Sequence, residues 1–108
     1  MIGKSNELGF EVIRQAQLGN ADSLSYLAEH AKDRLFVYIF RLTLDHHLAE
    51  DLAQETIVRM LQAIKQLKIT NRRSFWAWLY STALGRVQHH FRDSGNKSNN
   101  SKANINSE

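Results

Sequence analysis

Apolar residues recur every three or four positions along most of this chain, the spacing that places them on one side of an α-helix. The first such stripe lies between roughly Glu7 and Leu18 and consists of Leu8, Val12, Ile13 and Ala16. Gly19 and Asn20 follow, and both residue types adopt the left-handed conformation that closes a last helical turn. The pattern therefore predicts a short first helix that ends before Gly19.

Two longer helices are predicted next. One is capped by Asp22 or Ser23 and runs to about Thr43, and the other has Asp45 as its N-cap and runs from about His46 to Leu67. The residues expected to face inward are Leu24, Leu27, Ala28, Ala31, Leu35, Tyr38, Ile39 and Leu42 in the first, and Leu48, Leu52, Ile57, Met60, Leu61 and Ile64 in the second.

A fourth helix is predicted from Phe75 to about Arg92, with Ser74 as its N-cap, after a polar and basic connection from Lys68 to Arg73. From Gly95 on, the chain is rich in Asn and Ser, which is typical of a flexible tail or linker. We therefore expect an all-α fold, a compact bundle of about four helices over residues 1–94. A disordered tail, or a truncated interdomain linker, is expected over residues 95–108.

The composition narrows the class of protein. The 108 residues include no proline and no cysteine, which argues against a turn-rich β-sandwich and excludes a disulfide scaffold and a thiolate metal site. No segment has the roughly 18–20 uninterrupted apolar residues of a membrane span, and the N-terminus lacks the apolar core of a signal peptide. We expect a soluble, cytoplasmic protein without membrane insertion.

Charge is divided unevenly along the chain. Residues 1–55 carry five basic and nine acidic side chains, a formal charge of −4, whereas residues 56–92 carry seven basic side chains and no acidic one, a formal charge of +7. This division suggests two partners of opposite charge, although helical domains also carry uneven charge by chance.

Motifs of catalysis and metal binding are missing from the sequence. It has no glycine-rich phosphate loop, no G-x-S-x-G elbow and no H-E-x-x-H pair. The adjacent residues of the pairs His46–His47 and His89–His90 point about 100° apart on a helix, so neither pair is expected to chelate an ion as an i, i+4 pair does. We therefore expect a protein that is not an enzyme and uses no metal and no cofactor.

Two segments carry side chains suited to binding. Asp51, Gln54 and Glu55 form a polar patch at i, i+3 and i+4, which suits pairing with a basic helix or is an ordinary solvated face. The segment from Lys68 to Arg92 combines basic residues with aromatic ones, as a single-stranded nucleic-acid site requires. The four aromatic residues are Phe75, Trp76, Trp78 and Tyr80.

Some of these aromatic residues must belong to the core. Two overlapping stripes compete for the inward position, one with Phe75 and Leu79 and the other with Trp76, Tyr80 and Phe91. Because both cannot be fully buried in a small domain, we expect one aromatic edge to stay accessible, and the spacing leaves open which one.

The run A-E-D-L-A-Q-E-T-I-V-R-M-L-Q-A-I at residues 49–64, followed by F-W-A-W-L-Y at residues 75–80, resembles region 2 of bacterial RNA polymerase sigma factors of the extracytoplasmic-function (ECF) type. The likeness includes R-L-T-L-D at residues 41–45 and extends over about Leu8 to Arg92. It implies a domain that binds core RNA polymerase and recognises and melts the promoter −10 element. The alternative is a sigma-like interaction module that binds polymerase or a regulator without reading DNA.

The resemblance also implies site residues. In the family, the equivalents of Asp51, Gln54 and Glu55, with Arg59 at their edge, dock on the clamp helices of the polymerase β′ subunit. The loop and the exposed side of the fourth helix bind the non-template strand of the −10 element, with one base flipped into a pocket of the loop. The residues expected to contact DNA are Lys68, Thr70, Asn71, Arg72, Arg73, Trp76, Tyr80 and Arg86. An anti-sigma factor that covers the same surfaces is a further implied partner.

The chain departs from the family pattern in two respects. Leu84 and Gly85 stand where the family has an Arg-Asn pair, and glycine offers no side chain for the base contact of that asparagine, so we expect Arg86 to supply the missing charge. The resemblance also implies a helix-turn-helix domain that binds the −35 element, and we do not expect one within these 108 residues. The chain is therefore expected to be a fragment cut in the interdomain linker or a naturally short protein, and its linker-like tail favours the first.

Overall fold

The computed structural model of the chain describes the backbone of residues 9–106 and the side chains of residues 9–93. In order, the elements are α2 (Phe10–Gln17), α3 (Ala21–Thr43), α4 (His46–Ala63), the short 3₁₀ helix η1 (Ile64–Gln66) and α5 (Arg72–Asn106). No strand occurs among the described residues. The predicted all-α fold with four helices is confirmed.

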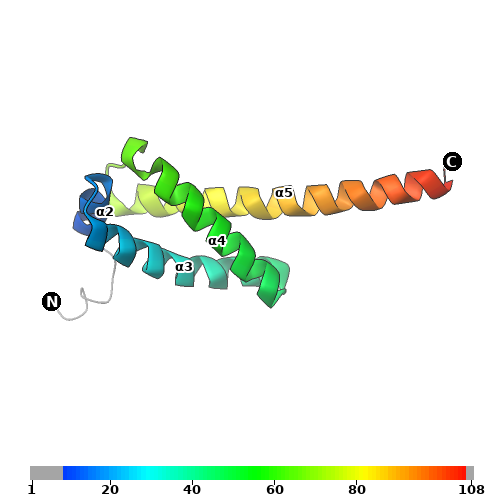
Figure 1. Cartoon of the computed structure of the whole chain (residues 1–108), viewed down its shortest axis with the longest axis horizontal. Helices are drawn as coiled ribbons and strands as arrows, with labels where there is room; N and C mark the ends of the chain where they lie inside the picture. The colour runs from blue at the N-terminus through cyan, green and yellow to red at the C-terminus, as the bar shows by residue number, and fades with distance from the viewer. Residues whose placement is uncertain (1–8, 107–108) are drawn as a thin grey trace.

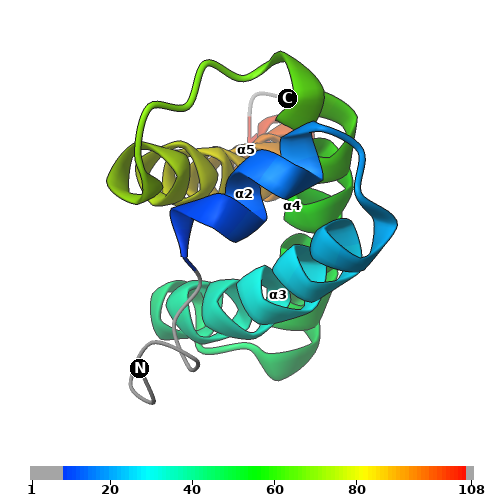
Figure 2. The ribbon, with the colours of Figure 1, turned by 90° about the vertical axis from the view of Figure 1, so that its left-hand side faces the viewer.

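The helices pack around one core. α3 and α4 form a helical hairpin, and α5 packs against both and extends past them (Figure 1). α2 lies across the end of the bundle where α5 begins, in contact with α3 and η1 (Figure 2). This arrangement leaves one side of α4 and one side of α5 exposed.

The core is built from inward rows at spacings of three and four residues, as the amphipathic pattern predicts. Its one buried polar side chain within residues 9–93 is Thr56, whose hydroxyl donates to the Leu52 carbonyl at 2.7 Å. The main buried residues are Leu27, Ala31, Leu35 and Ile39 on α3, Ala49, Leu52, Ala53, Ile57 and Met60 on α4, and Phe75, Leu79, Ala83 and Val87 on α5.

Two residues expected in the core are largely exposed, Leu42 at 44% and Leu61 at 43%. Leu42 lies in the last turn of α3. Helical periodicity predicts which side of a helix faces inward, but it does not predict where along the helix the packing of other helices ends. Leu61 follows the buried Met60 by one residue, which places it about 100° farther around α4, at the margin of the inward side.

Gly19 ends the first helix as predicted, with a positive φ of 93°. The predicted cap of the second helix is wrong, because Asn20, not Asp22 or Ser23, is the N-cap. Gly19 alone reverses the chain, which leaves Asn20 extended, and its side-chain oxygen accepts the Ser23 N–H at 2.8 Å. The predicted Asp45 cap of α4 is confirmed, since its carboxylate accepts the Leu48 N–H at 3.0 Å.

Three helix ends differ from the predictions. α4 ends at Ala63 and passes into η1 instead of running to Leu67. α5 begins at Arg72, because Asn71 and not Ser74 is in the capping position, and its side chain accepts the Ser74 N–H at 2.7 Å. α5 also continues beyond Arg92 to Asn106, with no proline to interrupt its hydrogen bonds.

The proposed division into a domain over residues 1–94 and a tail over residues 95–108 stays a prediction, since the side chains beyond Asp93 are outside the described ones. Residues 7 and 8 of the predicted first helix also lie outside the described residues. Among the described residues, no helix combines the length and the apolar character needed to cross a membrane.

The two glycines Gly19 and Gly85 allow a paired test of the backbone. An alanine Cβ at Gly19 would meet only ordinary contacts with Lys65, but the positive φ makes that residue strained, so Gly19→Ala should lower the free energy of unfolding by about 1–2 kcal/mol. Gly85 lies in α5 with open space around it, so Gly85→Ala should raise it by about 0.5–1 kcal/mol. Urea denaturation followed by circular dichroism measures both, and equal signs would contradict the assigned conformations.

Candidate functional site

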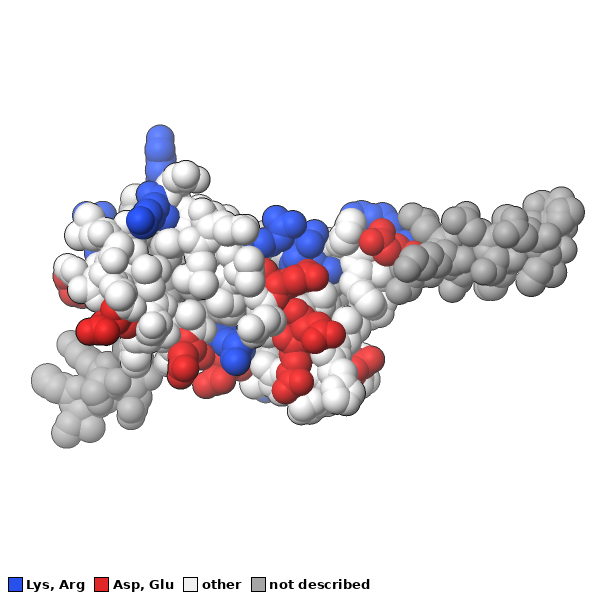
Figure 3. Space-filling view, viewed as in Figure 1, with Lys and Arg blue, Asp and Glu red and all other residues white. Residues whose placement is uncertain are grey.

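Asp51, Gln54 and Glu55 project from one exposed side of α4. Together with Arg59 they line a shallow depression whose other wall includes Arg86 of α5. Figure 3 shows acidic side chains gathered over this part of the molecule, with basic side chains directly beside them. The structure thus brings together the four residues that the resemblance assigns to polymerase binding, and we call this group, Asp51, Gln54, Glu55 and Arg59, the α4 patch.

Arg86 lies at the α4 patch and not near the basic residues 68–73. Its Nη1 is 3.6 Å from Oε1 of Glu55, and the side chains are 22% and 58% exposed. Eleven residues, close to three helical turns, separate Arg86 from the buried Phe75, so the two point in similar directions, and Arg86 is roughly 20 Å along α5 from Arg73. Its proposed contact with DNA stays a prediction, and its observed partner is a carboxylate of the α4 patch.

The segment between η1 and α5 is held in place by contacts on both sides of its exposed residues. The Gln17 side-chain amide donates to the carbonyls of Ile64, at 3.1 Å, and Leu67, at 2.8 Å. Ile69 is buried, with 8% of its surface exposed. Lys68 and Thr70 alternate with these anchored residues and are exposed, so the segment presents both of them to solvent.

The N-terminus of α5 closes the other end of this segment. Asn71 and Ser74 bond reciprocally, because the Asn71 side chain accepts the Ser74 N–H and the Ser74 hydroxyl donates to the Asn71 carbonyl at 2.8 Å. Arg72 and Arg73 therefore lie in the first turn of α5 and not in a loop. Two guanidinium groups at the positive end of a helix dipole form a region of high positive potential, which suits a bound phosphate.

The structure also decides which aromatic side of α5 is buried. Phe75 and Leu79 are fully buried, whereas Trp76 and Tyr80 are half-buried at the boundary with α3. The Trp76 ring lies 6.2 Å from that of His30 and 5.8 Å from that of Tyr80, which is 4.8 Å from the ring of Tyr38. We call the four residues His30, Trp76, Tyr80 and Tyr38 the aromatic row.

Two arginines of α3 lie against the aromatic row, although neither belongs to the basic segment predicted from the sequence. The Arg34 guanidinium is 4.7 Å from the centre of the Trp76 ring, close enough for a cation–π interaction. Arg41 lines a hollow with Tyr38 and Tyr80. The sequence pattern that indicates their position is the spacing of residues 34, 38 and 41, which places them on one side of a helix. Although residues 1–55 carry a net negative charge, two of their arginines thus lie beside the aromatic side chains of α5.

A further group lies at the start of α4. His46, His47 and Glu50 are exposed, and a donor atom of each lies within 4.8 Å of the others. The two adjacent histidines alone predict no ion site, but Glu50 follows them by four and three residues and falls between them around the helix.

Comparison with known proteins gives one matching family, Sigma-70 region 2, over residues 27–97. The chain is 34% identical over 84 residues to the ECF RNA polymerase sigma factor BldN of Streptomyces coelicolor, covering 78% of this chain and 31% of BldN. It is 32% identical over 71 residues to the ECF RNA polymerase sigma factor SigW of Bacillus subtilis, covering 66% of this chain and 37% of SigW. The chain spans about a third of the length of both relatives. No solved structure matches it significantly.

The hydrogen bonds of Gln17 are expected to hold the segment between η1 and α5 in place, and a substitution tests this. Gln17→Leu removes two hydrogen bonds to part-buried carbonyls and should lower the free energy of unfolding by about 1–2 kcal/mol. The same change at Gln15, whose side chain donates to the exposed Glu11 carboxylate, should alter it by no more than about 0.5 kcal/mol. Equal effects of both changes in urea denaturation would contradict the anchor.

Proposed function

Because the chain belongs to the sigma-70 region 2 family, we propose that it is a transcription-initiation domain that binds core RNA polymerase through the α4 patch and promoter DNA through the start of α5. The observation that carries this proposal is the arrangement of two chemically different surfaces on one bundle. One surface is the α4 patch, with its exposed carboxylates and amide. The other combines the exposed cations of residues 68–73 with the half-buried aromatic row.

The α4 patch suits a basic helical partner, and we propose the clamp helices of the polymerase β′ subunit. Asp51 and Glu55 supply acceptors for charge-assisted hydrogen bonds, and Gln54 adds an amide between them. The ion pair with Arg86 restrains Glu55, and Arg59 lines the same depression. Acidic side chains at this surface would also steer a basic partner toward it.

The start of α5 suits the separated non-template strand of the −10 element. Lys68, Arg72 and Arg73 would contact phosphates, while Thr70 and Asn71 would shape the pocket for a flipped base. Trp76 and Tyr80, which are half-buried on the first turns of α5, would add aromatic contacts to bases. Holding unpaired bases in this way shifts the melting equilibrium of the duplex toward the open form and requires no chemical step by the protein.

A second candidate function is a sigma-like module that binds polymerase or a regulator without reading DNA. Two observations favour it. Gly85 presents no side chain, and Arg86, which we expected to supply the missing charge, is paired with Glu55 of the α4 patch. An anti-sigma factor that covers one of the two surfaces fits either candidate.

Polymerase binding is tested by charge reversal within the α4 patch. Asp51→Arg should weaken binding to a β′ clamp-helix fragment by about tenfold or more in calorimetric titration, because it replaces an acceptor by a like charge facing a basic helix. Glu29→Arg makes the same change at an exposed residue of α3 and should leave binding unaltered. A tight complex with the Asp51→Arg variant would refute this docking surface.

DNA binding is tested at the other surface. The double variant Lys68→Glu with Arg73→Glu should abolish binding of a labelled single-stranded −10 oligonucleotide at low salt, measured by fluorescence anisotropy, because each residue contacts a phosphate. Lys32→Glu, an exposed lysine beside the α4 patch, should retain binding. If the double variant still binds DNA, these contacts are wrong. If no form binds DNA while the clamp fragment is bound, the second candidate function holds.

A further inference from the structure

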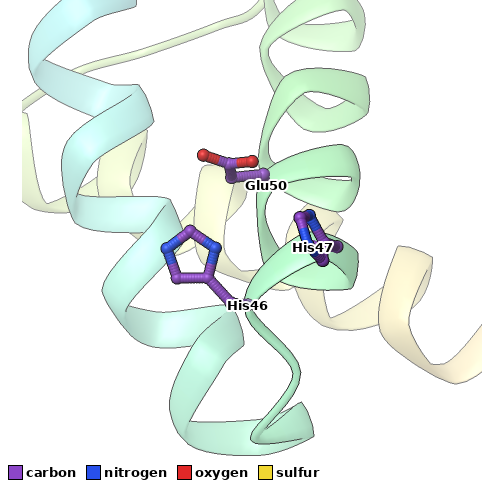
Figure 4. A group of neighbouring side chains, drawn as sticks. All are labelled: His46, His47 and Glu50. Atoms are coloured by element: carbon purple, nitrogen blue, oxygen red, sulfur yellow. The ribbon is translucent and has the colours of Figure 1, made fainter.

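We propose that His46, His47 and Glu50 form a binding site for a borderline divalent transition-metal ion, of which Zn²⁺ is the representative. Their donor atoms lie within 4.8 Å of one another, and all three side chains are exposed. Figure 4 shows His46 and Glu50 on the side of α4 that faces α3, with His47 farther around the helix. Imidazole nitrogen and carboxylate oxygen are ligands that such ions accept together.

The helix supplies the geometry of this group. Glu50 lies about 40° from His46 and 60° from His47 around the axis and one turn above them, so it stands between the two imidazoles. Ligand bonds of about 2.0–2.1 Å in a tetrahedral site require donor atoms about 3.3 Å apart. The group must therefore contract by roughly 1.5 Å at its widest, which rotation of exposed side chains allows.

The surroundings of the group restrain one ligand and add negative charge. The His46 ring packs edge-on against Phe36 at 5.1 Å, which limits the positions of that imidazole. His46 and Glu50 border a hollow between α3 and α4 that Asp33, Asp51 and Lys32 also line. The positive end of the α4 dipole by itself disfavours a cation here. The carboxylates of Asp33 and Asp51 offset this effect, and Lys32 adds only one positive charge.

The chain contains a second copy of the same spacing, which serves as an internal comparison. His89, His90 and Asp93 repeat the pattern H-H-x-x-acid, yet they do not form a group with converging donors in the described part of the chain. His89 is already 3.2 Å from Asp93, and His90 is half-buried on α5. Spacing alone therefore does not produce the convergence of donor atoms at the start of α4.

The test is calorimetric titration of the chain, without a histidine tag, with ZnCl₂ at neutral pH. We expect one saturable ion per chain, no binding of MgCl₂, and release of Zn²⁺ at about pH 5, where protonated imidazole no longer binds metal. His47→Gln and Glu50→Gln should each weaken binding by at least about tenfold, since each removes one of three ligands. His89→Gln should leave binding unchanged.

His47 and Glu50 are chosen over His46 because the His46 ring packs against Phe36, and circular dichroism verifies that their variants keep the helices. Absence of saturable Zn²⁺ binding would overturn the proposal. Unaltered binding by the His47 and Glu50 variants, or an equal loss in the His89 variant, would place the ion elsewhere and overturn it as well.

Discussion

The rotation of α5 about its own axis is the constraint on which both surfaces depend. Four buried residues at four-residue spacing, Phe75, Leu79, Ala83 and Val87, fix this rotation against the core. With that side inward, Trp76 and Tyr80 lie at the boundary with α3, while Arg86 reaches α4. A shift of one residue in the buried row would turn each side chain by about 100° and separate both sets from their partners.

The anchored segment before α5 connects this constraint to the proposed binding of DNA. The Gln17 side chain on α2 donates hydrogen bonds to carbonyls at the start of this segment. Ile69 within the segment is buried, and Asn71 caps α5. A flexible basic loop would lose conformational entropy when it bound a nucleic acid, and a loop already held at its ends loses less. The polar residues proposed to contact DNA, Lys68 to Arg73, are thus presented on a backbone that is held in place before binding.

Local signals in the sequence predicted much of the fold and only part of the site. Gly19 and Asp45 were identified as helix boundaries because each acts through its own backbone or a neighbour three residues away. The hydrogen bonds of Gln17 span 47 and 50 residues, and the pairing of Arg86 with Glu55 joins two helices, so no local pattern reveals them. Periodicity likewise leaves two inward stripes possible for α5, and only packing against α3 and α4 selects the one with Phe75.

The proposed function requires two separate surfaces on one bundle, and mapping of backbone amide shifts by NMR tests this requirement most directly. The chain would be titrated in turn with a β′ clamp-helix fragment and with a single-stranded −10 oligonucleotide. We expect the fragment to shift amides around the α4 patch, and the oligonucleotide to shift those of residues 68–80 and of α3 near Arg34. Shifts by both ligands over the same residues, or shifts by the oligonucleotide centred on α4, would contradict it.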